Sequence, residues 1–404
     1  MRVPVPRVAA IAAAVALLAM ALWFVPSRPA YAHSGSTAAQ AAKAPAPPAK
    51  QTPKAKKTAV EKHAEPWPDG ATIAARRADA EARRLFQSTD TLHVTLTADF
   101  GAVNGDRNRT STKTFPASLA VAGDNGTQLS IPVTLKTRGK IRLDPRVCAF
   151  APLSVTFTKK DAKSTPFDGQ RTLKLVAHCQ NSDIYDQFIV KEYLAYRLFN
   201  LVTPRSFRAR LARVEYVNAK NAKPMFTRYA VFVEDDDDVA RRLEGRVLEF
   251  PHTAFENYDQ DALTTMMVFQ YMIGNTDFSL WALHNAKMVQ TRYRPLYPIV
   301  WDFDASGIVF PPYVMPDPSL QLSSFEDRKY RGPCRTLEAF EPTFALFRAK
   351  RAESLALLDA QPELSESHRK QAKRFLEQFY ATLERKDALK KEFVDKCNPK
   401  NNTM

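Results

Sequence analysis

The 404-residue sequence contains few glycines and cysteines and only one long apolar run. Its 12 glycines form no glycine-rich phosphate-binding loop. Its four cysteines include no Cys-x-x-Cys pair, so the ligand spacing of a zinc site is missing. A single apolar run excludes a membrane protein with many spanning helices. With 45% hydrophobic and 25% charged residues and no evident repeat, the chain is not collagen, a coiled-coil rod or wholly disordered.

The amino-terminal segment has the layout of an export signal. Arg2 and Arg7 precede an uncharged apolar run over residues 8–25, and Ala30-Tyr31-Ala32 supplies the small residues of a cleavage site. This order predicts a secretory signal peptide over residues 1–32. An uncleaved inner-membrane anchor is the main alternative, because about 18 apolar residues approach the length that spans a bilayer. In either case we expect an exported protein, periplasmic or extracellular.

Residues 33–67 are rich in Ala, Pro, Lys, Ser and Thr and have almost no large apolar side chains. Such a segment cannot bury enough surface to offset the entropy of ordering it, so its composition predicts a disordered linker. The signal and the linker together carry +7 of the formal net charge of +15. The remaining +8 is scattered over the rest of the chain, which disfavours nucleic acid as a partner.

The four cysteines, Cys148, Cys179, Cys334 and Cys397, all lie in the exported part. An even number of cysteines in an oxidising compartment predicts disulfides, and three pairings can be drawn. We favour Cys148–Cys179 and Cys334–Cys397, because each pair lies within one half of the domain. One or more buried free thiols are the alternative.

Residues 68–404 change from mainly strand patterns to mainly helical patterns. Alternation of apolar and polar residues predicts strands over 92–99, 114–121, 127–136, 153–158, 171–176, 209–217, 225–234 and 296–301. Helical periodicity predicts helices over 71–87, 183–201, 235–243, 259–273, 337–358 and 365–395. This order favours an α+β fold of two lobes with a cleft between them. The β-rich N-terminal lobe would span about 88–235 and the mostly helical C-terminal lobe about 236–404.

Polar residues concentrate in the irregular region between residues 274 and 333. Asp277 directly follows an apolar helix, Asn285 follows soon after, and a predicted strand leads into Asp302 and Asp304. Carboxylates at the end of a buried strand are costly unless something pairs with them, and a divalent metal is a common partner for Asp and Asn oxygens. The structural alternative is that Asp277 and Asp302 cap helices or turns.

Three kinds of chemistry fit the run from Asp302 to Gly307. A calcium loop would need a Glu at the twelfth position, where the sequence has Tyr313. An aspartyl-phosphate hydrolase, with Asp302 as nucleophile and Asp304 as acid/base, would need a parallel-sheet domain after the motif. Kinase-type phosphoryl transfer needs an Asp that orients the acceptor hydroxyl, followed by an Asn and an Asp that hold magnesium. Asp277, Asn285 and Asp302 occur in that order.

The sequence here resembles the CotH family of atypical, spore-coat-type kinases and their exported bacterial relatives. The similarity runs roughly from residue 131 to residue 316. Its most specific parts are Gly274-Asn275-Thr276-Asp277 and Trp301-Asp302-Phe303-Asp304. The supporting parts are the strand ending in Arg138-Gly139, the strand Thr172–Val176, the helix with Lys191-Glu192 and the strand Tyr229–Glu234.

The resemblance implies a protein-kinase-like fold that transfers phosphate from ATP, with Mg²⁺ or Mn²⁺, to a protein or cell-surface acceptor. It implies that Asp277 is the catalytic residue and that Asn285 and Asp302 bind the metal, with Asp304 assisting. The remaining roles that it implies concern nucleotide binding: Glu234 near the adenine, and Lys174 on the phosphates with Glu192 as its partner, Lys136 or Lys140 being alternatives to Lys174.

A second class of function stays open alongside the kinase. The same domain without catalysis would be a binding module of the cell envelope, and a Lys-rich tether suits a protein that reaches across the periplasm. A hydrolase is a third option, in which the acids around Asp302 would bind metal without nucleotide.

Overall fold

The computed structural model describes residues 58–293, 296–315, 317–324 and 326–397. The predicted signal peptide (1–32) and most of the predicted linker (33–57) lie outside these residues. The last part of the predicted linker is not disordered, because it contains the short helix α1 (Ala59–Ala64). Thr58 and Glu61 form a capping box at its start, and this Thr-x-x-Glu signal is visible in the sequence.

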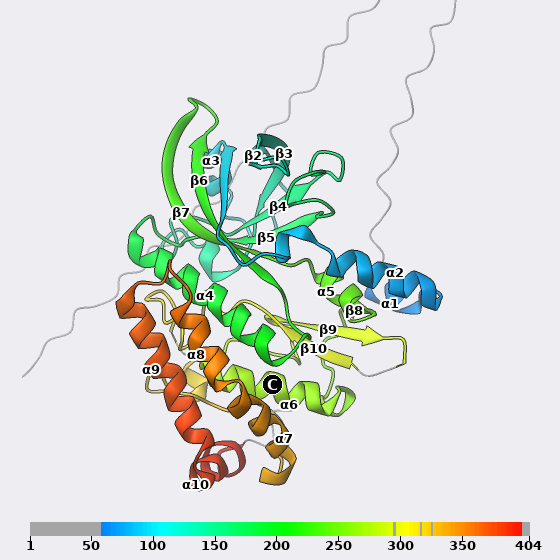
Figure 1. Cartoon of the computed structure of the whole chain (residues 1–404), viewed down its shortest axis with the longest axis vertical. Coiled ribbons are helices and arrows are strands. Elements are labelled where there is room, and N and C mark those ends of the chain that lie inside the picture. The colour runs from blue at the N-terminus through cyan, green and yellow to red at the C-terminus, as the bar shows by residue number, and fades with distance from the viewer. Residues whose placement is uncertain (1–57, 294–295, 316, 325, 398–404) are drawn as a thin grey trace, which may run out of the picture. The chain divides into compact units, whose positions relative to one another are not determined.

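Seven strands between residues 92 and 233 close into a barrel (Figure 1). The barrel closes because the β6 strand pairs in parallel with β1, and Leu92 is the partner of Ala212. Around the barrel the strand order is β1-β2-β3-β4-β5-β7-β6, and β6 and β7 form the predicted hairpin. The strands are β1 (Leu92–Ala98), β2 (Phe115–Ala122), β3 (Gln128–Thr137), β4 (Leu153–Phe157), β5 (Thr172–Val176), β6 (Ala209–Asn218) and β7 (Lys223–Val233).

The predicted two-lobed, protein-kinase-like fold with a mostly helical C-terminal lobe is wrong. The first half forms a closed barrel, and the second half mixes helices with a three-stranded antiparallel sheet of order β10-β9-β8. Of these three strands the sequence analysis predicted only the last along the chain, and it assigned the residues of the second to the irregular region between 274 and 333. They are β8 (Gly245–Leu248), β9 (Ala286–Thr291) and β10 (Leu296–Val300).

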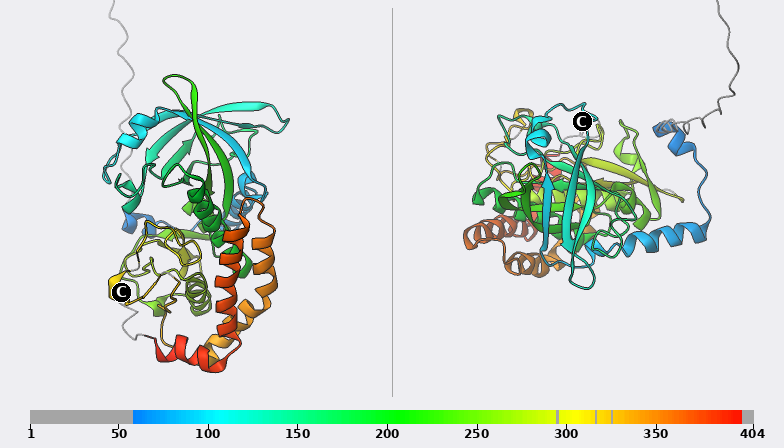
Figure 2. Two further views of the ribbon diagram at one scale, coloured as in Figure 1. Left: turned by 90° about the vertical axis from the view of Figure 1, so that its left-hand side faces the viewer. Right: turned by 90° about the horizontal axis from the view of Figure 1, so that it is seen from above.

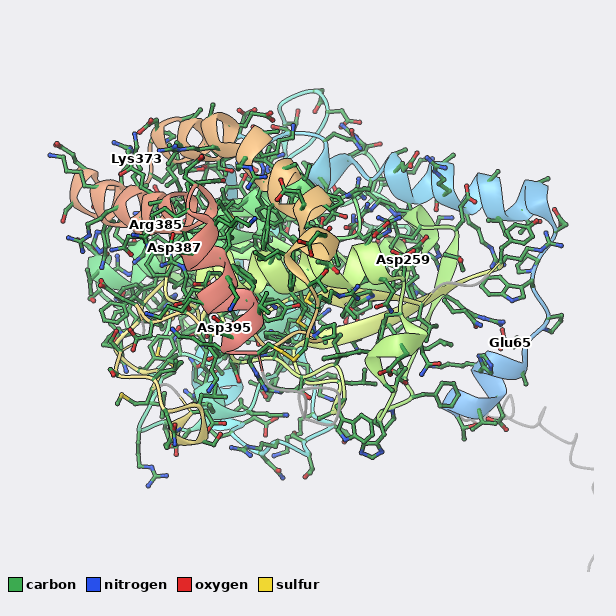
Figure 3. All side chains as sticks on the ribbon, turned by 90° about the horizontal axis from the view of Figure 1, so that it is seen from below. Glu65, Asp259, Lys373, Arg385, Asp387 and Asp395 are labelled. Carbon is green, nitrogen blue, oxygen red and sulfur yellow. A yellow bond between two sulfur atoms is a disulfide. The ribbon has the colours of Figure 1, made fainter. Side chains whose placement is uncertain are left out.

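Most of the predicted helices are present, and two of the long ones are divided. The predicted helix 337–358 is divided at Lys350, and 365–395 is divided at Arg385, whose backbone is extended (Figure 3). The helices α8 and α9 run side by side (Figure 2). The helices are α2 (Gly70–Glu81), α3 (Phe100–Gly105), α4 (Asp183–Val202), α5 (Asp236–Arg242), α6 (Gln260–Ile273), α7 (Leu337–Ala349), α8 (Arg351–Asp359), α9 (Glu366–Leu383) and α10 (Lys386–Leu389).

Two hydrophobic cores hold these elements together. One fills the barrel interior, where alternate side chains of each strand, such as Leu96 and Leu119, are fully buried. The other surrounds α4 and α6 and includes Phe269 and Phe303. Because α4 contacts β6 and β7 on one side and α6 and α8 on the other, it connects the barrel to the helices. None of the helices formed by the described residues is long and apolar enough to cross a membrane.

Both favoured disulfides are present, which confirms the predicted pairing. Cys148 is bonded to Cys179, and Cys334 is bonded to Cys397. Two disulfides without a free cysteine are typical of proteins that fold outside the cytoplasm. The chain is therefore an exported protein.

Candidate functional site

The loop that carries Asp277 begins where α6 ends. Gly274 ends the helix with φ +64°, and a Cβ there would lie 2.9 Å from the Phe375 ring and 3.4 Å from the Gly307 backbone. Only glycine combines this left-handed conformation with such close packing. The Gly307 amide donates to the Gly274 carbonyl at 3.1 Å. The α6 loop is therefore fixed to the segment that follows Asp302 and Asp304.

The second acidic segment follows the β10 strand, and its residues are buried from Phe303 onwards. Phe303 is fully buried against Tyr196, whose ring centroid lies 4.7 Å away. Asp302 has φ +66°, and its amide donates to the Tyr196 hydroxyl at 3.0 Å. A left-handed Asp is uncommon, and strained backbone of this kind is concentrated at functional sites. Because Phe303 anchors the segment in the core, Asp302 and Asp304 face a cavity together.

That cavity has a volume of about 440 Å³ and lies where the barrel meets the α6 and β10 loops. On the barrel side, the cavity is lined by the connection between β3 and β4, which carries Arg138, Lys140 and Arg142. The loops contribute four of the predicted site residues, Asp277, Asn285, Asp302 and Asp304. We call this the Asp277 cavity.

Hydrogen bonds fix Asp277 within the cavity. The Asn285 amide donates to both the carbonyl oxygen of Asp277, at 2.8 Å, and its Oδ2, at 3.0 Å. The His284 Nε2 lies 2.9 Å from Asp277 Oδ1, and Lys140 Nζ lies 3.3 Å from His284 Nδ1. The Asp277 side chain is 42% exposed, so a ligand in the cavity can reach it.

Burial makes two carboxyl groups at and behind the site hard to ionise, those of Asp304 and Glu192. Burial, with the neighbouring charge of Asp302, raises the pKa of Asp304 to about 7, although Arg142 at 3.7 Å opposes this. Burial also raises the pKa of Glu192 well above its usual range, and the charges of Asp304 and Asp302 add to it. The Oε1 of Glu192 is buried without a hydrogen-bond partner. The buried carboxyl groups of Asp304 and Glu192 thus favour their neutral form unless a further positive charge approaches them.

A divalent cation would supply such a charge and favour the ionised carboxylates, and the donors present suit Mg²⁺ or Mn²⁺. The Asn285 amide oxygen accepts no hydrogen bond from the described residues, and Asp302 and Asp304 offer carboxylate oxygens on the same cavity. Among the residues with defined positions, no three His, Cys, Asp or Glu side chains are grouped to hold a metal alone. Mg²⁺ commonly binds one or two carboxylates and takes its other ligands from phosphate and water, so the residues fit a metal that arrives with nucleotide.

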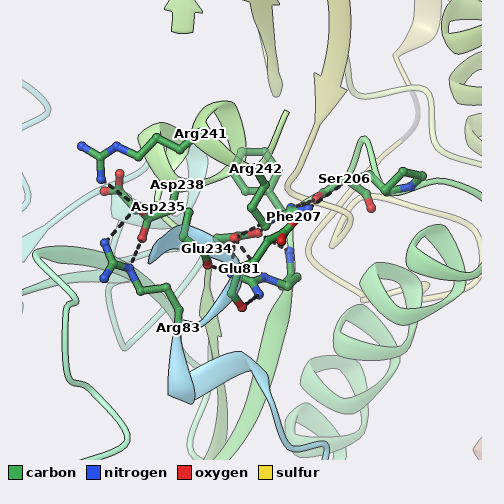
Figure 4. A network of polar contacts seen from close by, with 12 residues as sticks. Glu81, Arg83, Ser206, Phe207, Glu234, Asp235, Asp238, Arg241 and Arg242 are labelled. Carbon is green, nitrogen blue, oxygen red and sulfur yellow. Dashed lines mark hydrogen bonds and ion pairs between the residues drawn. The ribbon is translucent and has the colours of Figure 1, made fainter. Parts of the chain in front are cut away.

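Three of the predicted nucleotide-binding residues lie outside the cavity. Lys174 is paired with Asp236 rather than Glu192 and lies 5.0 Å from the Trp301 ring centre. Glu234 is fully buried, and Arg208 and Arg242 each lie within 2.8 Å of its Oε1 (Figure 4). Glu192 is buried behind Asp304, without lining the cavity.

The two alternatives to Lys174 as the phosphate-contacting lysine lie in different places. Lys140 lines the cavity, whereas Lys136 is exposed on the β3 strand. Sequence reasoning did not assign roles to His284 and Arg142. His284 is the residue before Asn285 and lies between the two predicted motifs, so its position was the only available signal. The sequence contains no signal for Arg142, because only the fold brings its side chain to within 3.7 Å of Asp304.

Two of the chemistries considered from the sequence lose their structural basis. In a calcium loop Ser306 would face the ion, but its hydroxyl is buried and donates to the Phe303 carbonyl at 2.6 Å. An aspartyl-phosphate hydrolase needs parallel strands around the nucleophile, but β10 pairs antiparallel with β9. Along the described chain, no strand follows β10. Comparison with protein families and with curated proteins finds no match for this chain.

Proposed function

We propose that this protein is an exported phosphotransferase that transfers phosphate from a metal-bound nucleotide at the Asp277 cavity. The observation that carries the proposal is the meeting of Asp277, Asn285 and Asp302 on one cavity whose opposite wall is basic. These residues lie on two loops that are separate in sequence and joined by backbone hydrogen bonds. The resemblance to CotH kinases, which rests on these same two loops, supports the assignment.

Asp277 is the group that we expect to handle the proton. The acceptor hydroxyl oxygen would attack the γ-phosphorus, the bond from that phosphorus to the leaving oxygen of the nucleoside diphosphate would break, and the hydroxyl proton would pass to Asp277. Asn285 and His284 hold both of its carboxylate oxygens, so the side chain is oriented before a substrate arrives. Such positioning is the main protein contribution in phosphoryl transfer.

The basic wall would bind the phosphates. Arg138, Lys140 and Arg142 all come from the β3–β4 connection, in which Gly139 has φ +105°. Arginine presents a planar set of donors that matches phosphate oxygens. This wall would take the place of a glycine-rich loop, which the sequence lacks.

Asn285, Asp302 and Asp304 would hold the divalent ion. When bound, Mg²⁺ or Mn²⁺ supplies charge neutralisation to the phosphates. The buried carboxyl of Asp304 would then lose its proton more readily, because a cation favours the ionised form. This accounts for a buried acid beside Asp302 better than a purely structural role does.

The acceptor would be met outside the cytoplasm. Because the protein is exported, its acceptor would be another protein or a polymer of the cell surface, in the periplasm or outside the cell. The amino-terminal segment would either be removed or anchor the chain in the inner membrane. The cavity opens beside the exposed side chains of Ile141 and Met315, which a macromolecular acceptor could cover.

The test measures binding and transfer separately in the full-length chain. We expect ATP with Mg²⁺ or Mn²⁺ to raise the melting temperature of the wild type. The substitution Asp302→Asn should abolish this shift. Asp277→Asn should keep the shift and lower transfer of the γ-phosphate by roughly 10²–10⁴-fold, the usual effect of losing a general base.

The matched control is Asp387→Asn, which changes an exposed acid on α10 (labelled in Figure 3) that does not line the cavity. It should alter neither the shift nor the transfer. A folded wild type without any nucleotide-dependent shift would refute the proposal, and so would an Asp277→Asn protein with full transfer activity.

A second candidate is a binding module of the cell envelope that has no catalytic activity. One observation favours it: the lysine that the resemblance assigns to the phosphates is paired with Asp236 instead of Glu192. This candidate predicts no phosphate transfer from the wild type with any acceptor, and no nucleotide-dependent shift.

A further inference from the structure

A second cavity, of about 330 Å³, shares no lining residue with the Asp277 cavity. It lies where four elements meet: the connection from η1 (Arg84–Phe86) to β1, the end of α4, the start of β6 and the end of α5. Three arginines from different elements line it: Arg197 on α4, Arg208 before β6 and Arg242 at the end of α5. We call it the arginine cavity.

The arginine cavity carries an excess of positive charge. Glu234 is the acid that pairs with Arg208 and Arg242, and it is fully buried (Figure 4). Arg197 has no carboxylate partner among the described residues, and its Nη1 donates only to the Tyr193 hydroxyl, at 2.9 Å. Three guanidinium groups and one carboxylate leave a charge of about +2 around a concave space, which attracts anions.

The arginines are held rigidly and still have free donors. Arg242 donates to both Glu234 oxygens and to the carbonyls of Pro204 and Ser206, and its side chain is only 10% exposed. Arg208 is fixed in the same way by Glu234 and by the carbonyls at the end of α2. A guanidinium has five N–H donors, so each of these two keeps one, and Arg197 keeps four.

The remaining lining combines hydroxyl groups with apolar surface, which suits a small organic molecule that carries a polar group. The apolar side chains are those of Phe86, Pro204 and Ala209. The volume lies at the lower end of the range for small-molecule sites. The hydroxyl-bearing residues are Ser88, Thr89, Thr203 and Ser206.

We propose that the arginine cavity binds a small organic phosphate monoester. A phosphate monoester carries a charge of about −1.5 to −2 at neutral pH, which matches the local +2. Its three terminal oxygens can accept from several guanidinium groups at once, whereas a carboxylate has two oxygens and one charge. The proposal does not depend on the activity at the Asp277 cavity.

The experiment uses glycerol 3-phosphate as the probe and isothermal titration calorimetry of the full-length chain. We expect the wild type to bind it, and glycerol alone not to bind. The substitution Arg197→Gln removes the arginine without a carboxylate partner and should weaken binding roughly tenfold or more, the effect of losing a charged hydrogen bond. As the matched control, Arg374→Gln changes an exposed arginine on α9 that lines neither cavity, and it should bind the probe like the wild type.

A second variant keeps the test valid if Arg197→Gln does not fold. Thr89 is exposed at the cavity and its side chain supports no other element, so Thr89→Glu adds a negative charge at the mouth without burying it. This variant should also weaken binding of the probe. The proposal is overturned if the wild type does not bind the probe, or if Arg197→Gln and Thr89→Glu both bind it like the wild type.

Discussion

At the scale of single residues, the orientation of Asp277 depends on a chain of three side chains. Lys140 approaches His284 Nδ1 at 3.3 Å, and His284 Nε2 approaches Asp277 Oδ1 at 2.9 Å. With Lys140 donating to Nδ1, the His284 proton lies on Nε2 and is donated to Asp277. Such a chain joins the barrel wall to the loop after α6, so it connects the basic side of the cavity to the carboxylate.

We predict that His284→Gln lowers kcat roughly 10- to 100-fold and leaves the KM for nucleotide nearly unchanged, as for other residues that position a reactive group. The physical reason is that Asp277 keeps Asn285 but loses one of the two groups that orient it. Steady-state kinetics over a range of pH measures the change. His93→Gln, an exposed histidine on β1, is the control. Equal rates for His284→Gln and the wild type would contradict a positioning role.

A second prediction at this scale concerns the dependence of stability on pH. The ordinary pKa of the Asp304 carboxyl is 3.8. In the folded state this pKa is about 7, and burial is the largest cause of the rise. Between these values the folded state binds more protons than the unfolded chain. The free energy of unfolding of the protein therefore falls as the pH rises from about 4 to 7. Above about pH 7 the contribution of Asp304 no longer changes.

Asp304→Asn removes the ionisable group, so chemical denaturation in EDTA should show a weaker fall across this window. At pH 8 the variant should be more stable than the wild type by at least about 1.4 kcal/mol, the value of one pKa unit. A wild-type stability that rises between pH 4 and 7 while Asp304→Asn stays flat would show that the group is instead stabilised as an anion.

At the scale of elements, the local sequence pattern predicted individual helices and strands, but it did not predict which distant strands pair. The helix predicted over 183–201 is α4, and the strands predicted over 209–217 and 225–234 are the β6–β7 hairpin. These signals are contained in neighbouring residues. The closure of the barrel depends on the pairing of Leu92 with Ala212, and no local pattern encodes which distant strands meet.

The breaks in the C-terminal helices were missed for a related reason. Neither Lys350 nor Arg385 lies beside a glycine or proline that would mark a helix end. Tertiary packing sets these positions, because α7, α8 and α9 all contact one another. A sequence pattern with continuous helical periodicity therefore predicted two helices where the structure has more.

In the candidate site, too, the sequence predicted individual residues but not the ion pairs that they form. Asp277, Asn285, Asp302 and Asp304 were found because polar residues in apolar surroundings are conspicuous in a sequence. Lys174 and Glu192 were proposed as a pair, but ion pairs depend on three-dimensional distance. The fold instead brings Asp236 to Lys174 and places Arg142 near Asp304.

At the scale of the whole molecule, the two disulfides act on different parts of the structure. The Cys148–Cys179 bond joins the β3–β4 connection, which carries the basic wall of the Asp277 cavity, to the segment after β5. In that region Arg142 also donates to the Ala177 carbonyl. The Cys334–Cys397 bond instead fixes the end of the described chain to the segment before α7. The first bond therefore supports the basic wall of the Asp277 cavity, and the second supports the helical part.

We predict that replacing either pair with alanines lowers the free energy of unfolding by about 2–4 kcal/mol, because each bond restricts the unfolded chain. Only Cys148→Ala with Cys179→Ala should also weaken nucleotide binding, since it releases the wall with Arg138, Lys140 and Arg142. Denaturant unfolding and calorimetric titration of both variants measure the two effects. The Cys334/Cys397 variant is the matched control, because it removes a disulfide remote from that wall. Equal losses of nucleotide affinity in both variants would mean that global stability, and not the local cross-link, maintains the cavity.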